Sequence, residues 1–354
     1  MATEAGMTGP KPDCEASTPL GGEDSSQGAL AFHPSHITLS TFNRLLACYP
    51  RTVEQVHRNK LIQKLQSKPK SKPKRKSAET STDAQDTTPT QTDLTPAEEK
   101  HIQDDLDTFL KLDRWRYETL PKNLVERKGD EAHLTKDELV DIMAWKTSHG
   151  RSRPMLIGMI KANQPSTITK ATSEAFTSIP VSDPIKKPEE SFPKLSLDTL
   201  TTSLRGVGPA TASLILSIAT VVGDPMRQVP FYSDDTYLWL VFVVYPIPEE
   251  GQVKVRGVKA NGELDVKYNL KEFRGLWEEV QRLRVRLSEG DLGSVSTVGV
   301  EKVAYVLRHI AVSGYYSDQH HKVSEATVVE STEVPGGQTK KRKVKEEKTR
   351  SAKK

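Results

Sequence analysis

The stretch that most constrains the fold covers residues 204–212, with the sequence LRGVGPATA. Gly206 and Gly208 flank the apolar Val207, so the backbone can turn tightly there and come close to a ligand. Pro209 suits the first turn of a helix, where its missing N–H costs nothing. We therefore predict two helices joined by a tight turn, with free N–H groups and a positive helix end that suit a phosphate.

Apolar residues on both sides of this turn follow a helical pattern. Leu197, Leu200 and Leu204 precede it, and Ser196 is the expected N-cap of their helix. A long apolar helix is expected after the turn, up to residue 222. An ordinary helix–helix connection, in which the glycines serve packing only, would have the same pattern.

An acidic pair follows about 25 residues later, in the sequence Ser-Asp-Asp-Thr-Tyr-Leu at 233–238. The carboxylate of Asp235 is an anion at neutral pH unless its surroundings intervene, because a model Asp has a pKa of about 3.9. Such an anion can stabilise positive charge that develops on a sugar and can orient an attacking water. The alternative is an N-terminal helix cap, since Ser233, Asp234 and Asp235 are all good capping residues.

Together these residues resemble the helix-hairpin-helix DNA glycosylases of the endonuclease III and adenine-mismatch glycosylase lineage. Residues 204–212 match the family's L-x-G-V-G-x-x-T-A hairpin, and residues 235–237 match its D-T-h segment. The flanking Trp-Arg-Tyr at 115–117 and Met-Ala-Trp-Lys at 143–146 are most similar to the Amun-like glycosylase-domain proteins. The spacing from hairpin to acid is longer than is usual for the family, so Asp234 is a second candidate for the catalytic position.

The resemblance implies roles for further residues. It assigns DNA binding to the hairpin residues Gly206, Val207, Gly208, Pro209 and Thr211. Bifunctional relatives carry a Schiff-base Lys where this chain has Ala210, so the resemblance implies hydrolysis through water without a lyase step.

Aromatic side chains could stack on a base that has left the helix. The candidates for such a pocket are Tyr232, Trp115 and Trp145. The more ordinary interpretation of each is packing within the core or on a helix face.

The composition bears on cofactors and on the membrane. Cys14 and Cys48 are too few for an iron–sulfur cluster, and the histidines show no metal-ligand spacing, so we expect no metal and no cofactor. No apolar run approaches membrane-spanning length, and the chain lacks the pattern of a secretory signal at its start. We expect a soluble, intracellular protein.

The net charge of +4 conceals an uneven distribution. Residues 58–76 carry nine Lys or Arg and no acid, and residues 323–354 carry nine bases and five acids. The rest of the chain has 33 bases and 42 acids, a net charge of −9. Basic character is therefore concentrated outside the expected core, which is unusual for a protein that must neutralise phosphates.

The sequence predicts one all-α domain over residues 94–318, of the helix-hairpin-helix glycosylase type. Alternating apolar residues around Asn261-Gly262 predict a small β-hairpin insertion within residues 252–268. We expect disorder in residues 1–37 and in the basic tail 319–354, and a basic, Thr-rich linker over 67–93. Residues 38–66 predict short helices able to dock on the main domain.

The tail contains a run that resembles a nuclear import signal, formed by Lys340, Lys341, Arg342, Lys343 and Lys345. Residues 68–76 are a second candidate. The leading hypothesis is a nuclear DNA-binding protein, with DNA and an import receptor as partners, that acts as a monofunctional glycosylase through Asp235. The alternative is a catalytically inactive glycosylase-fold module that binds DNA or protein in chromatin or transcription.

Overall fold

The computed structural model describes residues 31–67, 94–127, 132–150, 153–245, 257–259, 264–288 and 293–317. These residues are mostly helical and contain no strand, which confirms the all-α class. The described residues from 31 to 314 belong to one compact unit, and Tyr315–Lys354 form a second, of which only residues 315–317 are described. Among the described helices, none combines the length and the apolar character needed to cross a bilayer.

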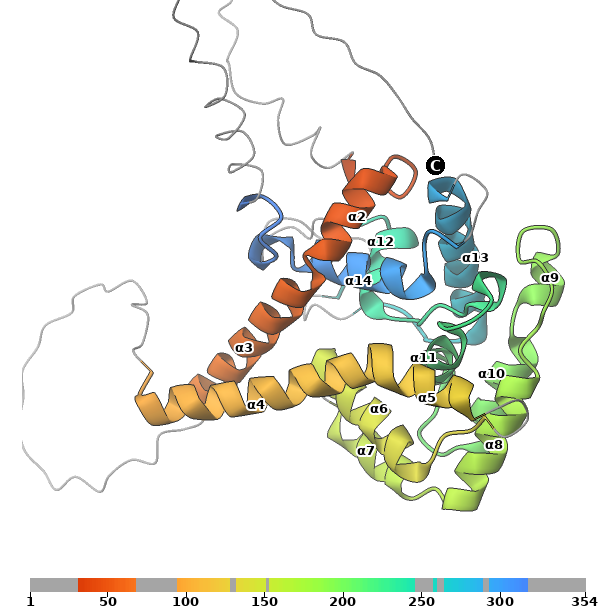
Figure 1. The fold of residues 1–354 in the computed structure, drawn as a ribbon, viewed down its shortest axis with the longest axis horizontal. Helices are drawn as coiled ribbons and strands as arrows, with labels where there is room; N and C mark the ends of the chain where they lie inside the picture. The colour runs from red at the N-terminus through yellow and green to blue at the C-terminus, as the bar shows by residue number, and fades with distance from the viewer. Residues whose placement is uncertain are drawn as a thin grey trace, which may run out of the picture. The chain divides into compact units, whose positions relative to one another are not determined.

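Figure 1 labels the α-helices in chain order. Their bounds are α2 Leu39–Ala47, α3 Tyr49–Ser67, α4 Pro96–Arg114, α5 Leu120–Glu126, α6 Lys136–His149, α7 Pro154–Lys161, α8 Pro165–Thr177, α9 Pro188–Ser191, α10 Lys194–Ser203, α11 Pro209–Thr220, α12 Asp234–Leu240, α13 Leu270–Leu287 and α14 Thr297–Arg308. A π-helical turn, Trp115–Thr119, joins α4 to α5, and short 3₁₀ turns cover Pro225–Arg227 and Ile310–Val312.

Local sequence signals explain several helix starts. Thr95 and Thr135 are N-caps whose capping boxes are completed by Glu98 and Glu138, and Pro209 occupies the first turn of α11. The prediction that Ser196 caps α10 is wrong, because the helix begins two residues earlier. The buried Ser196 hydroxyl instead lies 3.1 Å from that of Ser178.

The predicted β-hairpin is not present as strands in the described residues. Val258 and Leu264 form an isolated antiparallel bridge, and the Asn261-Gly262 turn between them lies outside those residues.

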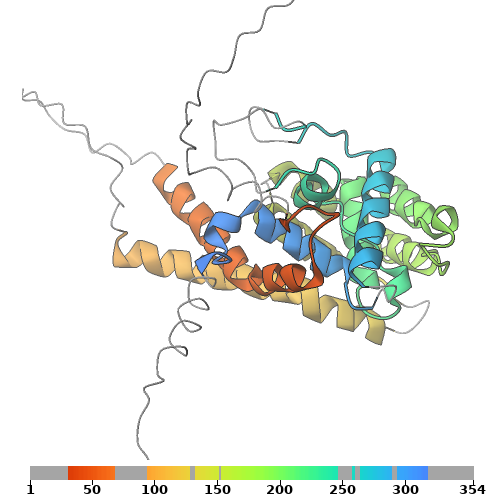
Figure 2. The same cartoon turned by 90° about the horizontal axis from the view of Figure 1, so that it is seen from above.

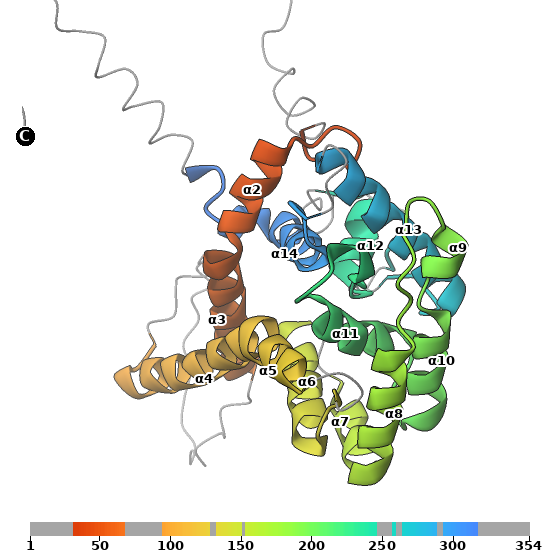
Figure 3. The ribbon, with the colours of Figure 1, turned by 45° about the vertical axis from the view of Figure 1, so that its right-hand side comes forward.

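The apolar helix α11 lies at the centre of the unit. Eight consecutive residues of α11, from Thr211 to Ile218, are buried. Figures 1 and 3 show α6, α7, α8 and α10 on one side of α11 and α12, α13 and α14 on the other. The turn before α11 and the start of α12 therefore lie between the two helix groups.

The N-terminal helices pack against the same unit. Helices α2 and α3 lie against α14, as the view from above shows, and α3 also packs on α4. Their apolar residues Phe42, Leu45 and Val53 are buried. The indole N–H of Trp239 in α12 donates to the carbonyl of Phe32 at 2.9 Å. Residues 31–67 are thus part of the core from which the site is built.

Candidate functional site

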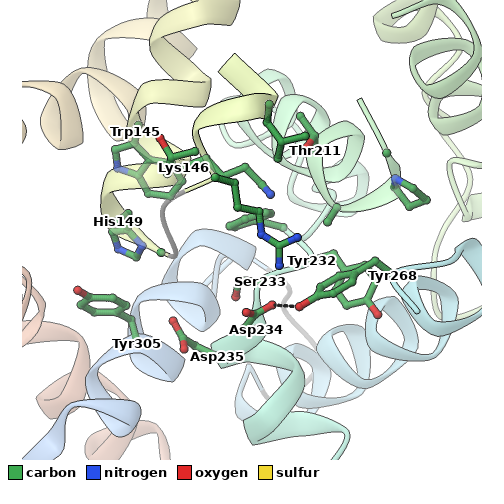
Figure 4. Close-up of a pocket in the computed structure, with 18 of the residues that line it drawn as sticks. Trp145, Lys146, His149, Thr211, Tyr232, Ser233, Asp234, Asp235, Tyr268 and Tyr305 are labelled. Carbon is green, nitrogen blue, oxygen red and sulfur yellow. Dashed lines mark hydrogen bonds between the residues drawn. The ribbon is translucent and has the colours of Figure 1, made fainter. Parts of the chain in front are cut away.

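A cavity of about 460 Å³ opens where α6, α12, α14 and the turn before α11 meet. Its lining includes both segments that the sequence singled out: Gly206, Gly208, Pro209, Thr211, Asp234 and Asp235. In Figure 4, Trp145, Lys146 and His149 line the cavity from α6, and the two acids face them from α12. Residues that are distant in the chain therefore line one cavity.

The turn keeps its backbone accessible from this cavity. Gly206 has a φ of 80°, and a Cβ at this position would lie 2.9 Å from the Cβ of Met159, so only glycine fits without strain. Gly208 is exposed, and a Cβ there would meet no atom within 4 Å. The N–H groups of Gly206, Gly208 and Ala210 make no hydrogen bond within the described part of the chain. These donors are available to a ligand.

Val207 does not share this accessibility. Its side chain is buried, and its N–H donates to the carbonyl of Leu204 at 3.3 Å. Val207 lines a second, more open hollow on the other side of the turn, not the cavity that holds the acids. Its apolar side chain anchors the turn to the core.

Asn163, which follows α7, stabilises the turn through side-chain hydrogen bonds. Its side-chain carbonyl accepts the N–H of Arg205 at 2.8 Å, and its amide donates to the carbonyl of Arg205 at 3.0 Å. The same amide donates to the carbonyl of Ile160 at 3.0 Å, so it ties the end of α7 to the turn. The sequence analysis missed Asn163, because a single Asn 42 residues before its partner leaves no local pattern.

Asp235 lies at the start of α12 and is not the cap of that helix. Ser233 is the N-cap, and its hydroxyl accepts the N–H of Thr236 at 3.1 Å. The Asp235 carboxylate is 16 % exposed and lies 3.3 Å from the guanidinium of Arg308 in α14. Burial raises the pKa of Asp235, while Arg308 and the Lys60 ammonium lower it. Asp235 is thus a largely desolvated carboxylate that faces two cations.

Asp234 has a different partner. The hydroxyl of Tyr268 donates to its Oδ1 at 2.8 Å, and this bond is drawn in Figure 4. Asp235 lies beside Arg308 and Lys60, whereas Asp234 accepts from the Tyr268 hydroxyl and interacts with the charge of Lys146, so their chemical surroundings differ.

Lys60 reaches the cavity from the N-terminal helix α3. Its ammonium donates to the carbonyls of Ser148, His149 and Gly150 at the end of α6, at 3.3, 2.6 and 3.2 Å. Burial lowers the pKa of Lys60, and Asp235 opposes that shift. No sequence signal could have placed it beside Asp235, because the two residues meet only through the packing of α3 on the rest of the unit.

Aromatic rings form one wall of the cavity. The ring centroids of Trp145 and His149 lie 4.6 Å apart, those of His149 and Tyr305 4.2 Å apart, and those of Tyr305 and His309 4.7 Å apart. Burial lowers the pKa of His149 well below its ordinary value and that of His309 to about 3. Both imidazoles are therefore neutral at pH 7, and the wall carries no charge.

The three predicted pocket aromatics have different surroundings. Trp145 and Tyr232 line the cavity, although both are almost fully buried. The hydroxyl of Tyr232 lies 3.2 Å from Glu272, and its ring stacks on Phe273, so most of its surface belongs to the core. Trp115 is half-buried in the π-helical turn and does not line the cavity. Its assignment to the pocket is wrong, since the turn carries Arg116 and Tyr117 into the core instead.

A buried hydrogen-bond network supports the aromatic wall. The Trp145 indole N–H donates to Asp113 at 2.8 Å, and the Tyr49 hydroxyl donates to the same carboxylate at 3.0 Å. His149 Nε2 lies 3.3 Å from the Tyr49 oxygen and can donate to it. This network fixes the orientation of Trp145 and His149, the two rings that line the cavity from α6.

Several predicted features lie outside the described residues, namely both basic runs, 68–76 and 340–345, the tail 319–354 and residues 1–30. The predicted disorder of residues 1–37 is wrong for residues 31–37, because Phe32 and Ile37 are buried in the core. Within the described residues, no three His, Cys, Asp or Glu side chains group as metal ligands. No family model, curated protein or solved structure matches the chain.

Proposed function

We propose that this chain is a nuclear DNA-binding protein with a helix-hairpin-helix glycosylase-like fold, and that it hydrolyses the N-glycosidic bond of an extruded nucleotide. One observation carries the proposal: the carboxylate of Asp235 and the backbone of Gly206 and Gly208 open on the same cavity. A hairpin that holds a DNA strand beside a cavity would bring the sugar of an extruded nucleotide toward the acid at its floor.

The chemistry that we assign to Asp235 is that of a carboxylate beside an oxocarbenium-like sugar. As the bond between C1′ and the base nitrogen breaks, its electron pair leaves with the base, and the anion stabilises the positive charge on the sugar. A water then attacks C1′ and gives its proton to the carboxylate. Arg308 and Lys60 support this role, because both cations favour the ionised form of Asp235.

The size and lining of the cavity suit a nucleoside. Pockets for small ligands typically measure about 300–1,000 Å³ and are lined by apolar and aromatic groups. The neutral rings of Trp145, His149 and Tyr305 line the cavity, where stacking on a base would require them to become more exposed than their present 0–8 %. Ala210, which also lines the cavity, offers no amine for a lyase step, and this favours simple hydrolysis.

The proposed location in the nucleus and the proposed import receptor rest on the basic run of residues 340–345 alone. A fluorescent fusion of the full chain should be nuclear. The same fusion with Lys341 and Arg342 changed to Ala should lose that preference, and equal nuclear signal from both would refute the assignment.

The test of the enzymatic proposal is product formation on a panel of duplexes, each with one damaged or mismatched base. Released abasic sites are revealed by alkaline strand cleavage. We expect at least one substrate to give product, and Asp235→Asn to reduce its rate by a factor of about 10² or more, because a single electrostatic group at a reacting centre typically contributes that much. The matched control is Asp104→Asn on α4, which removes an exposed carboxylate far from the cavity.

The outcomes separate the proposal from its main competitor. If no substrate gives product while duplex binding is intact, the chain is a binding module, and the pair of Asp235 with Arg308 is a structural ion pair. If product forms equally well with Asp235→Asn, the hydrolysis belongs to another group and the assignment of Asp235 fails.

A further inference from the structure

The charges around the cavity are not balanced. Four cations line it, and the lining acids are Asp234 and Asp235. The lining cations are Lys60, Lys146, Arg153 and Arg308. Two of these have partners in the chain, since Arg308 pairs with Asp235 and Lys60 donates to three backbone carbonyls. The other two, Lys146 and Arg153, lack such partners among the described residues.

The side chains of Lys146 and Arg153 make no hydrogen bond or ion pair within the described residues, although their backbone carbonyls accept the N–H groups of Gly150 and Leu156. Lys146 lies on α6 beside Trp145, and Figure 4 shows it on the cavity side opposite Asp234. The guanidinium carbon of Arg153 lies 6.0 Å from the ring centroid of Tyr268, across the same cavity. Burial lowers the pKa of Lys146, and the Arg153 charge adds to the effect while Asp234 opposes it.

Lys146 is half-buried and Arg153 is exposed. Two cations that line one cavity repel one another unless an anion joins them. Elsewhere in the unit, comparable half-buried cations have carboxylate partners, such as Arg127 with Glu138 and Arg58 with Glu99. The cavity therefore has a place for an anion that the chain itself does not supply.

The hairpin extends this electropositive surface. The unbonded N–H groups of Gly208 and Ala210 belong to residues that line the same cavity, at the N-terminus of the twelve-residue helix α11. Backbone N–H groups at a helix start donate to phosphate oxygens, and Lys and Arg neutralise the phosphate charge. Two side-chain cations and two backbone donors thus converge on one space.

We propose that Lys146 and Arg153 bind the phosphodiester adjacent to the nucleotide that enters the cavity. The inference rests on one part of the proposed function, namely that DNA reaches the cavity. It does not require that a bond is hydrolysed there. The two cations offset the repulsion between Asp235 and the DNA backbone. They also concentrate positive charge at the site itself.

The experiment measures duplex binding as a function of salt. The duplex carries a tetrahydrofuran abasic analogue, which has no glycosidic bond to cleave, and its affinity for the full chain is followed by fluorescence anisotropy from 50 to 200 mM KCl. Each lost phosphate contact lowers the slope of log K against log salt by roughly 0.9. We expect that decrease for Lys146→Met and for Arg153→Met, with binding roughly 3- to 10-fold weaker at 100 mM KCl.

Matched controls guard against two artefacts. Lys111→Met removes an exposed charge on α4 outside the cavity and should leave the slope unchanged. Thermal melting should show Lys146→Met folded and at least as stable as the wild type, because a half-buried cation without a carboxylate partner has been removed. An unchanged slope in both cavity variants overturns the inference.

A second arm identifies the phosphate. Neutral methylphosphonate linkages are placed one at a time on either side of the abasic analogue. We expect one of them to weaken wild-type binding and to have no added effect on the double variant Lys146→Met, Arg153→Met. Additive effects at every linkage would overturn the inference, because the cations would then contact other phosphates.

A third arm separates a DNA phosphate from a small free anion. Inorganic phosphate and a nucleoside monophosphate are titrated into the wild-type chain without DNA. We expect both to bind far more weakly than the duplex. If either binds as tightly as the duplex and loses its affinity in the two variants, the cavity is a small-anion site and the inference fails. Absence of glycosylase product would refute only the proposed hydrolysis, since no arm of this experiment depends on bond cleavage.

Discussion

Two opposing effects act on the pKa of Asp235. Burial favours its protonated form, whereas the Arg308 guanidinium at 3.3 Å and the Lys60 ammonium favour the carboxylate. The other nearby groups, Tyr305 and the imidazole of His149, are neutral at pH 7. Because burial still raises the pKa of Asp235 overall, a reaction that needs the carboxylate should lose rate on the acid side at a pH above the usual range for Asp.

Replacement of Arg308 by Met tests this balance. Loss of the cation favours the protonated acid, so the pKa of Asp235 should rise and the acid limb of kcat/KM should move to higher pH by about one unit. The measurement is the pH dependence of base release between pH 4 and 9 for wild type, Arg308→Met and the exposed control Arg114→Met. An acid limb that does not move would show that Arg308 does not control the ionisation of Asp235.

At the scale of single elements, the turn before α11 depends on a residue that is not part of it. Asn163 makes hydrogen bonds to both the N–H and the carbonyl of Arg205, and through Ile160 it links them to α7. Gly206 approaches Met159 in the same helix. The turn therefore holds its shape because α7 supports it, and its amides keep a fixed direction.

Asn163→Ala should remove the hydrogen bonds that connect the turn to α7. Loss of these hydrogen bonds from a buried amide should cost about 1–3 kcal/mol of stability, which a chemical denaturation curve can measure. If the turn binds DNA as proposed, duplex affinity should fall equally for all sequences, because contacts to the DNA backbone carry no sequence information. The adjacent exposed residue provides the control, since Gln164→Ala should leave both quantities unchanged. A sequence-dependent loss of affinity would contradict the assigned role of the turn.

Local signals in the sequence were sufficient to predict the turn before α11, but not to predict the residues that contact the turn. Gly206, Gly208 and Pro209 encode their own backbone geometry, and the Thr135 capping box encodes a helix start. The helix α10 starts before Ser196 because packing against α8 can override a good local cap. Contacts across long chain separations, such as those of Asn163 and Lys60, leave no period or motif, so only the folded structure could reveal them.

At the scale of the whole unit, one buried ion pair connects the first half of the chain to its last helix. Arg116 in the π-helical turn lies 2.8 Å from Glu301 in α14, and the Tyr117 hydroxyl donates to the same carboxylate at 2.9 Å. The Arg116 guanidinium carbon also lies 4.5 Å from the Trp145 ring centroid, directly behind the cavity wall. The sequence predicted neither partner, because acid and base are 185 residues apart.

Removal of one partner should be far more damaging than removal of both. Glu301→Gln leaves the Arg116 charge buried without a counterion, which should cost about 3–5 kcal/mol and lower Tm by roughly 10 °C. The double variant Arg116→Met, Glu301→Leu removes both charges and should recover much of that loss, because apolar pairs of similar volume replace buried ion pairs at little cost. The control Glu279→Gln breaks an exposed pair with Arg282 and should change stability by less than about 1 kcal/mol. If the Tm of Glu301→Gln is lowered no more than that of the control Glu279→Gln, the Arg116–Glu301 pair does not stabilise the unit. The cavity wall would then be positioned by apolar packing alone.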